Sequence, residues 1–152
     1  MASFKDGRKK IIARNKRAKH DYAIGDSFEA GIVLQGTEVK SLRDGKATIA
    51  EAYVQITDFE AFLHGCHIPE YLYGNRNNHE PRRTRKLLLN RREINKIKIQ
   101  LEQKGYTAVP LELYFRDGYA KLSFGLGKGK KLHDKRQSEK AKTAKRELRD
   151  QY

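Results

Sequence analysis

Residues 107–126 read TAVPLELYFRDGYAKLSFGL, and their alternation of apolar and polar side chains is the clearest structural signal in the chain. A period of two predicts two β-strands, each with one apolar face. The residues expected on these faces are Thr107, Val109, Leu111, Leu113 and Phe115, followed by Ala120, Leu122, Phe124 and Leu126. Asp117-Gly118 between the two strands is a two-residue hairpin signal. Pro110 lacks an amide proton, so we expect a sheet edge or a bulge there.

Further strands are predicted upstream of this hairpin. In FEAGIVL, residues 28–34, apolar residues again alternate with Glu29, Gly31 and Val33. In AYVQITDFEAFLHG, residues 52–65, two short strands are expected to flank a turn near Asp58.

Two helices interrupt the strands. GTEVKSLRDG, residues 36–45, predicts a short helix with Thr37 as a possible N-cap and Gly45 at its end. A second helix is predicted after Asn90, which can cap it, with Glu93 three residues further on. Its apolar positions and its stop signal are Ile94, Ile97, Leu101 and Gly105. Five to seven strands with one or two helices indicate a mainly β fold, a small antiparallel β-barrel of the OB type.

The charge of the chain is concentrated at its two ends. Residues 1–19 carry eight Lys or Arg and one acidic residue, and residues 128–152 carry ten against four, within a total net charge of +14. We therefore expect a basic N-terminal arm at 1–19, a barrel domain at 20–127 and a basic tail at 128–152. The tail is rich in helix formers after Ser138, so we expect it to be disordered when free and helical against a partner.

This distribution of charge favours nucleic acid as the partner, because each Lys or Arg that meets a phosphate releases counterions. An anionic membrane surface is less favoured, since the tail has only a thin apolar stripe at Ala141, Ala144 and Leu148. No run of about 18 apolar residues could span a membrane. The single Cys66 fits a reducing compartment, so we expect a cytoplasmic protein.

The sequence offers little for catalysis or metal binding. His64-Gly65-Cys66-His67 has neither a second Cys pair nor a His pair to complete a tetrahedral zinc site. His20-Asp21 and His79-Glu80 are the candidate acid–base pairs, and neighbours in sequence rarely converge on one substrate atom. GLGKGKK, residues 125–131, lacks the Ser or Thr of a phosphate loop. We expect neither an enzyme nor a cofactor.

Two features leave alternatives open. RRTRKLLLNRR, residues 82–92, is either a solvated loop leading into a buried strand or helix, or a basic rim that faces RNA. Glu38 either favours the positive end of a helix or accepts hydrogen bonds from RNA, and Glu29 either points outward without a role or does the same.

Four stretches resemble, in order, the small protein B family, whose members partner transfer-messenger RNA (tmRNA) in bacterial ribosome rescue. They are NKRAKHDY at 15–22, FEAGIVLQGTEVKSLRDGKA at 28–47, RTRKLLLNRREI at 83–94 and GLGKGKKLHDKR at 125–136. The resemblance implies an OB-related barrel with inserted helices. One face would hold the tRNA-like domain of tmRNA, around its D-loop and elbow.

Residue by residue, the resemblance implies an RNA-binding set and a tail set. The RNA-binding set is Asn15, Lys16, Arg17, His20, Glu29, Gln35, Glu38, Lys40, Leu89, Asn90, Lys128, Lys130 and Lys131. The tail set, expected near the ribosomal decoding centre, is His133, Asp134, Lys135 and Arg136. The distal tail differs from some members in that Leu148 and Tyr152 are its largest apolar candidates.

The resemblance also implies a mechanism without chemistry. The barrel would read RNA shape, and the tail would enter the empty mRNA channel of a stalled ribosome. A monomer would deliver alanyl-tmRNA together with elongation factor Tu. The alternative is a ribosomal or general RNA-binding OB protein with basic arms, which would bind unstructured RNA by aromatic stacking.

Overall fold

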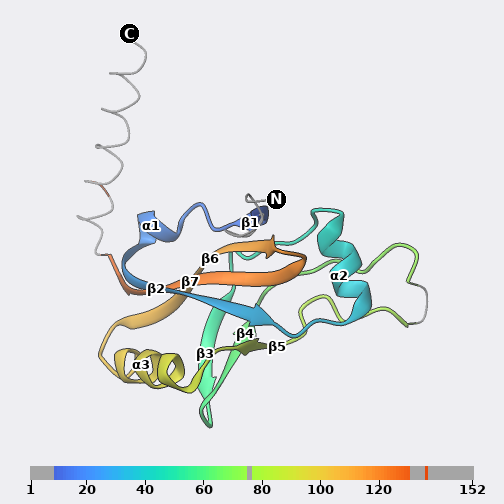
Figure 1. The fold of residues 1–152 in the computed structure, drawn as a ribbon. Coiled ribbons are helices and arrows are strands. Elements are labelled where there is room, and N and C mark those ends of the chain that lie inside the picture. The colour runs from blue at the N-terminus through green and yellow to red at the C-terminus, as the bar shows by residue number, and fades with distance from the viewer. Residues whose placement is uncertain (1–8, 75–76, 131–135, 137–152) are drawn as a thin grey trace, which may run out of the picture.

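A computed structural model describes residues 9–74, 77–130 and 136 of the chain (Figure 1). The described residues form seven strands and three helices. The strands are β1 (Lys9–Arg14), β2 (Tyr22–Ile32), β3 (Tyr53–Thr57), β4 (Glu60–His64), β5 (Arg85–Leu88), β6 (Tyr106–Arg116) and β7 (Tyr119–Gly129). The helices are α1 (Ala18–Asp21), α2 (Gly36–Arg43) and α3 (Arg91–Leu101).

The sheet closes on itself as an antiparallel, OB-like barrel, as the sequence predicted. Around the ring the order is β6-β3-β4-β5-β2-β7, and β7 pairs again with β6. β1 pairs with β6 as an additional strand. Closure leaves the ring itself without the free edges that would otherwise pair with other chains. Figure 1 shows α1 where β2 begins and α2 just beyond its end.

The β6–β7 hairpin confirms the turn and the bulge expected from the sequence. Arg116 lies opposite Tyr119, and Asp117 and Gly118 both have positive φ, 53° and 84°, as a two-residue turn of this kind requires. The register shifts between Pro110 and Glu112, which marks the bulge.

Because of the bulge, the prediction of which β6 side chains face the core is wrong in part. One extra residue reverses which side chains point inward. Before the bulge Ala108 packs in the core cluster, while Val109 is buried outside that cluster and Thr107 and Leu111 are only partly buried. After the bulge the expected Leu113 and Phe115 pack in the core. On β7 the expectation is confirmed, since Leu122, Phe124 and Leu126 all join the core.

The helix boundaries match the sequence at α3 and differ at α2. At α3 the Glu93 amide donates to the Asn90 side chain at 2.8 Å and the Asn90 amide donates to Glu93 at 3.3 Å, so Asn90 is the expected cap. At α2 the N-cap is Gln35, because the helix already begins at Gly36. The expected cap Thr37 lies inside the first turn, where its hydroxyl contacts His79 at 2.9 Å.

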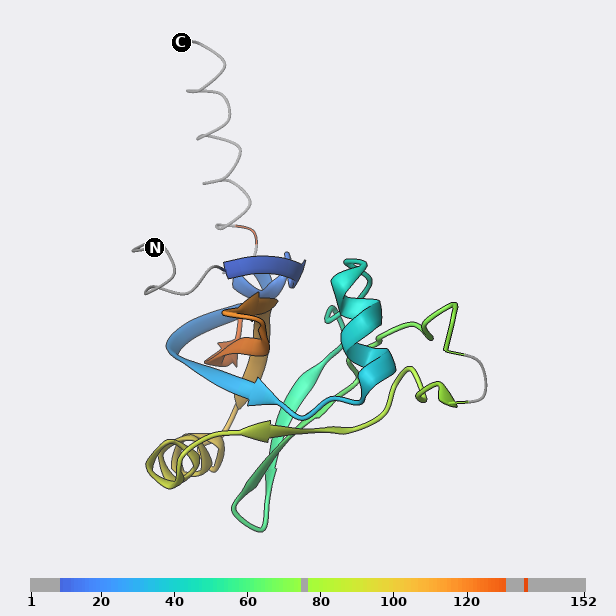
Figure 2. The same ribbon diagram turned by 45° about the vertical axis from the view of Figure 1, so that its right-hand side comes forward.

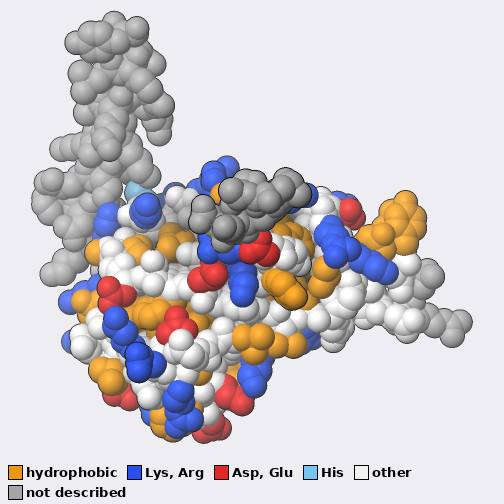
Figure 3. Space-filling view, in the orientation of Figure 1, with side chains coloured by type: hydrophobic (Ala, Val, Ile, Leu, Met, Phe, Trp, Pro, Cys, Tyr) orange, Lys and Arg blue, Asp and Glu red, His pale blue; other side chains and the backbone are white. Residues whose placement is uncertain are grey.

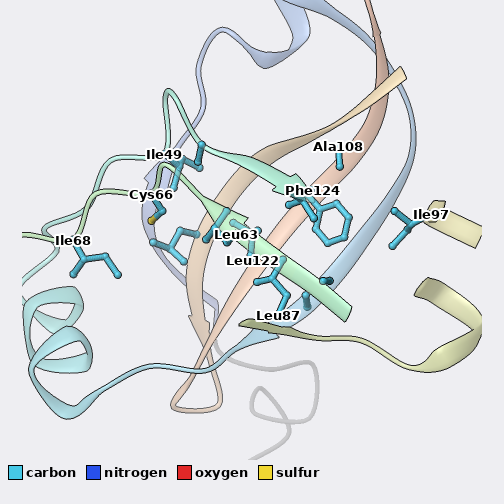
Figure 4. Packing of buried hydrophobic residues seen from close by; sticks show 14 of the residues in the cluster. Ile49, Leu63, Cys66, Ile68, Leu87, Ile97, Ala108, Leu122 and Phe124 are labelled. Atoms are coloured by element: carbon cyan, nitrogen blue, oxygen red, sulfur yellow. The ribbon is translucent and has the colours of Figure 1, made fainter. Parts of the chain in front are cut away.

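The core gathers side chains from the barrel and both longer helices (Figure 4). Its fully buried members include Ala30, Leu42, Leu63, Leu87, Ile97, Leu122 and Phe124. The tight turn expected near Asp58 joins β3 to β4, with positive φ at Asp58 and Phe59.

The folded unit extends beyond the boundaries expected at residues 20 and 127. β1 pairs with β6, Ile12 and Ala13 pack against the core, and Ala18 is buried. The basic stretch before residue 20 thus contributes a strand, because it pairs with β6 and packs Ile12 and Ala13 against the core. At the other end β7 continues to Gly129, and the Lys130 amide donates to the Asp21 carbonyl at 2.8 Å.

Candidate nucleic-acid interface

Most of the residues expected to bind RNA lie on β2 or on the segments at its two ends, and Figure 1 shows β2 running from α1 to the start of α2. Asn15, Lys16, Arg17 and His20 lie on and before α1, at the start of the strand. Glu29 lies in its second half, and Gln35, Glu38 and Lys40 lie on the α2 side. β2 and β5 are antiparallel, with Gly31 opposite Leu88. The chain that continues from β5 through Leu89 and Asn90 therefore runs toward the part of β2 that carries Glu29. The set therefore forms three neighbouring groups: the first lies around α1, the second at Glu29, Leu89 and Asn90, and the third on the α2 side.

Asn15 fixes the first group to the barrel. Its amide donates to the Leu111 carbonyl at 2.9 Å, and its side-chain amide donates to the Pro110 carbonyl at 3.0 Å. Both acceptors belong to the β6 bulge, so the irregular strand holds the segment that carries the exposed cations Lys16 and Arg17.

A hollow of about 400 Å³ opens beside this segment. Its lining combines cationic, polar and apolar side chains: Arg14, Asn15, Lys16, Ala18, Lys19, Leu111, Glu112 and Ser123. Because Ser123 of β7 pairs with Glu29 of β2, the hollow lies next to the Glu29 strand position. The first two groups therefore share one continuous face.

The polar groups of α1 are held in place by one another. His20 is buried, and its Nδ1 lies 2.9 Å from Asp21 Oδ1 and 3.2 Å from Arg17 Nη2. Lys130 Nζ donates to the Lys19 carbonyl at 2.8 Å. The chain that leaves β7 toward the tail is thereby fastened to α1, and its cation joins those of the α1 segment.

Glu29 is an exposed carboxylate whose position is fixed by two side chains of β6. The hydroxyl of Tyr114 donates to Glu29 Oε2, and Arg116 Nη1 lies 2.8 Å from the same oxygen. Burial and the hydrogen bond to Glu29 raise the pKa of the Tyr114 phenol, so it stays a donor at neutral pH. This support leaves Oε1 of Glu29 available for an incoming hydrogen-bond donor.

Sequence reasoning missed Tyr114 and Arg116. The signal that could have found them is the alternation of β6 after the bulge, where Glu112, Tyr114 and Arg116 share the face opposite the core. On that face the hydrogen bond from Lys9, at 2.7 Å, lowers the pKa of Glu112 against the opposing effect of burial, and Arg14 adds a contact at 3.2 Å.

Glu38, in contrast, is fully buried and has no surface to offer RNA. Its Oε1 accepts from Arg83 at 2.6 Å and from the Gln35 amide at 2.7 Å, and its Oε2 accepts from Arg85 Nε at 2.5 Å. Burial raises the pKa of Glu38, but these hydrogen bonds outweigh it and hold the pKa below its usual range. Its role in this structure is to tie α2 to β5.

Arg85 resolves part of the ambiguity in the basic run at 82–92. It is fully buried at the start of β5, where its remaining nitrogens donate to the carbonyls of Cys66 at 2.8 Å and Pro81 at 3.0 Å. The interpretation as a buried strand is therefore right for Arg85, which cannot form an RNA-facing rim. Arg82 and Arg92 stay exposed.

The other expected residues differ in how accessible they are. Asn90 is exposed, but its side-chain oxygen caps α3. Leu89 is partly buried against the core. Gln35, Lys40 and Lys128 are exposed, while Lys131, His133, Asp134 and Lys135 lie outside the described residues. Arg136 is described and is exposed.

Within residues 9–74, 77–130 and 136, no group of three or more His, Cys, Asp or Glu could hold a metal ion. Cys66 is buried, and burial raises the pKa of its thiol to about 11. His64, the first residue of the motif considered for zinc, stacks on Tyr53 with the ring centroids 5.0 Å apart.

None of the helices in the described part of the chain is long and apolar enough to cross a membrane.

This chain forms a closed OB-like barrel with fixed hydrogen-bonding groups among exposed cations. These features are typical of small RNA-binding β-barrel proteins. A sequence model of the family described as SmpB protein matches residues 12–152. The chain belongs to this family.

Similar proteins cover most of the chain. The SsrA-binding protein of Halalkalibacterium halodurans is 53% identical over 139 residues, which cover 91% of this chain and 90% of the relative. That of Streptomyces avermitilis is 56% identical over 143 residues, covering 94% and 81%. A chain in a solved structure of tmRNA-SmpB and the bacterial ribosome is 48% identical, with a TM-score of 0.67 and coverage of 78% of this chain and 84% of that chain.

Proposed function

We propose that this protein binds the tRNA-like domain of tmRNA (SsrA RNA) and brings it to stalled ribosomes for trans-translation. Its family membership and the SsrA-binding relatives support the RNA partner. The similarity to a chain of the tmRNA-SmpB ribosome structure supports the ribosome as the place of action.

The observation that carries this function is the shared face of Asn15, Glu29 and the hollow between them. Asn15 and Glu29 are each held by two contacts to the barrel, at 2.9 and 3.0 Å for Asn15 and from Tyr114 and Arg116 for Glu29. Glu29 offers a carboxylate acceptor beside this hollow, opposite Ser123 of its lining, while Arg14, Lys16 and Lys19 of the lining meet phosphates. Such fixed acceptors suit a folded RNA, whose 2′-hydroxyls and base amino groups are donors.

The residues then divide into four roles. Lys16, Arg17 and Lys128 lie exposed to contact phosphates, together with Lys130 at the root of the tail. Asn15, His20 and Glu29 fix the register by hydrogen bonding, and Gln35, Lys40, Leu89 and Asn90 extend the face along β2 and β5. Glu38 contributes indirectly, because it holds α2 against β5 through Arg83 and Arg85.

The tail from Lys131 onward, His133–Arg136 included, would enter the mRNA channel and reach the decoding centre. We propose further that the protein acts as a cytoplasmic monomer and arrives with elongation factor Tu and alanyl-tmRNA. It would perform no chemical step itself, since peptidyl transfer belongs to the ribosome.

A competition assay tests the proposed RNA partner. Labelled tRNA-like domain of tmRNA is bound at near-physiological salt, then challenged with excess bulk tRNA and with single-stranded RNA. We expect binding to survive both competitors. The logarithm of the binding constant should fall by about 0.7–0.9 for each phosphate contacted when the salt concentration rises tenfold. Displacement by either competitor would favour the general RNA-binding protein instead.

A further inference from the structure

The chain between β4 and β5 carries an exposed apolar projection that the proposed function does not use. We call Tyr71, Leu72 and Tyr73 the aromatic loop. Leu72 is 81% exposed and Tyr73 is 74% exposed, the two highest values among the large apolar side chains that the structure describes. Figure 2 shows this part of the chain running out past α2, away from the barrel.

The aromatic loop is held in position by the residues that follow it. Asn78 bonds both backbone groups of Tyr71: its Oδ1 accepts from the Tyr71 amide at 2.9 Å and its Nδ2 donates to the Tyr71 carbonyl at 2.6 Å. The Gly74 amide closes a turn onto the same carbonyl at 2.9 Å. A Cβ at Gly74 would lie 2.7 Å from Asn78 Nδ2, so only glycine allows this close packing.

Buried His79 then fastens the segment to the rest of the fold. One ring nitrogen lies 2.9 Å from the Thr37 hydroxyl of α2, and the other lies 2.8 Å from the Ile68 carbonyl. The side chains of Leu72 and Tyr73 are therefore presented to solvent by a backbone that is already ordered. Pre-ordering of this kind lowers the entropic cost of binding.

Cations of α2 lie beside the aromatic loop, which the exposed acid Glu70 directly precedes. Lys40 Nζ lies 5.7 Å from the centre of the Tyr71 ring, and Tyr71 and Tyr73 meet edge to face at 5.6 Å. Exposed Arg43 and Lys46 follow on and just after α2, where Asp44 is an exposed acid, while the carboxylate of Glu38 is buried and paired. Figure 3 shows hydrophobic side chains projecting beside a band of Lys and Arg at this end of the molecule.

We propose that the aromatic loop is a second RNA contact, in which Tyr73 stacks on an unpaired base and Leu72 packs against it, while Lys40 and Arg43 meet the adjoining phosphates. Exposed aromatic faces next to cations are the combination that single-stranded nucleotides require. The inference rests on the proposed function for its RNA. It concerns the α2 end of β2, where it adjoins the proposed RNA face and shares Lys40 with it, and not the part of that face at Asn15 and Glu29.

The test compares Tyr73→Ala with Tyr119→Ala. Tyr119 is the matched control, since it is 72% exposed and lies at the tip of the β6–β7 hairpin. Affinities are measured in two arms, for the tRNA-like domain of tmRNA and for ribosomal subunits, and thermal unfolding is recorded for each variant. We expect Tyr73→Ala to weaken one arm by about tenfold, which is the loss of one base–aromatic stack. The arm that weakens identifies the RNA.

Tyr73→Phe should keep the wild-type affinity, because stacking needs the ring and not the hydroxyl. Tyr73→Ala should leave the slope of affinity against salt unchanged, since it removes no phosphate contact. Unchanged affinity in both arms, or an equal loss for Tyr119→Ala, would overturn the proposal. So would a loss seen with whole subunits but absent with protein-free ribosomal RNA, because it would indicate a protein partner. If wild-type protein failed to select the tRNA-like domain while Tyr73→Ala still weakened ribosome binding, the proposed tmRNA partner would fail and this contact would stand.

Discussion

Substitution of Glu38 by Ala should strongly destabilise the fold while changing the RNA-binding face little. Glu38 and Arg85 are both fully buried, and their charged groups approach to 2.5 Å. Removing the carboxylate leaves the Arg85 guanidinium buried without its counter-charge and removes the acceptor of Arg83 as well. Breaking a buried pair in this way costs about 3–5 kcal/mol.

That loss is a large share of a typical free energy of unfolding, about 5–15 kcal/mol. For a domain of this size it lowers the midpoint of thermal unfolding by roughly 10–20 °C. Circular dichroism of wild type and Glu38→Ala measures it. Glu60→Ala is the control, because the pair of Glu60 with Lys86 at 3.3 Å is half exposed and should contribute less than about 1 kcal/mol.

The pH dependence gives a second readout of the same interaction. The pKa of Glu38 is lowered in the folded state, so its stabilising contribution is present above its unfolded pKa of about 4.3 and is lost as the pH falls through the folded pKa. The difference between wild type and Glu38→Ala should therefore shrink on acidification.

A midpoint for Glu38→Ala within about 3 °C of wild type, which is roughly 1 kcal/mol, would refute this reasoning. A loss of RNA affinity at a temperature where the variant remains folded would instead restore Glu38 as a direct RNA ligand. The double change of Glu38→Leu with Arg85→Met should recover much of the stability, because an apolar replacement leaves no buried charge from this pair.

Three other substitutions or deletions test neighbouring parts of the account. Glu29→Ala should weaken binding of the tRNA-like domain while the thermal midpoint changes little, since the side chain is exposed; an equivalent loss of stability would make Glu29 a structural residue. Asn90→Ala removes the α3 cap and should cost about 1 kcal/mol in urea unfolding, whereas Asn90→Ser should restore most of it; no loss for the alanine variant would contradict the capping role. Deletion of residues 133–152 should leave RNA affinity nearly intact and abolish peptide tagging in a cell-free translation assay, and a collapse of RNA binding would contradict the division between barrel and tail.

Local signals in the sequence were sufficient for most of the fold. The Asp117-Gly118 turn, the Asn90 cap and the bulge at Pro110 each depend on the conformational limits of one or two residues. The inward set of β6 was predicted only in part, because a bulge changes parity and its position to one residue decides which side chains face the core.

The candidate site was less predictable, because its geometry depends on contacts between distant segments. Tyr114 supports Glu29 across 85 positions, and Arg85 reaches Glu38 across 47. In the sequence Glu29 and Glu38 are alike, two acids within one motif. The structure separates them, since one lies on an outward strand position and the other on the inner side of α2.

The central claim, that the face of Asn15 and Glu29 binds the tRNA-like domain of tmRNA, is tested most directly by NMR. Backbone amide shifts of the isotope-labelled protein are followed while the RNA domain is added at near-physiological salt. We predict the largest changes at residues 14–20 and around Glu29, with the β3–β4 turn at Asp58 and Phe59 unaffected. Changes concentrated at that turn, or spread evenly over every exposed Lys and Arg, would contradict the account.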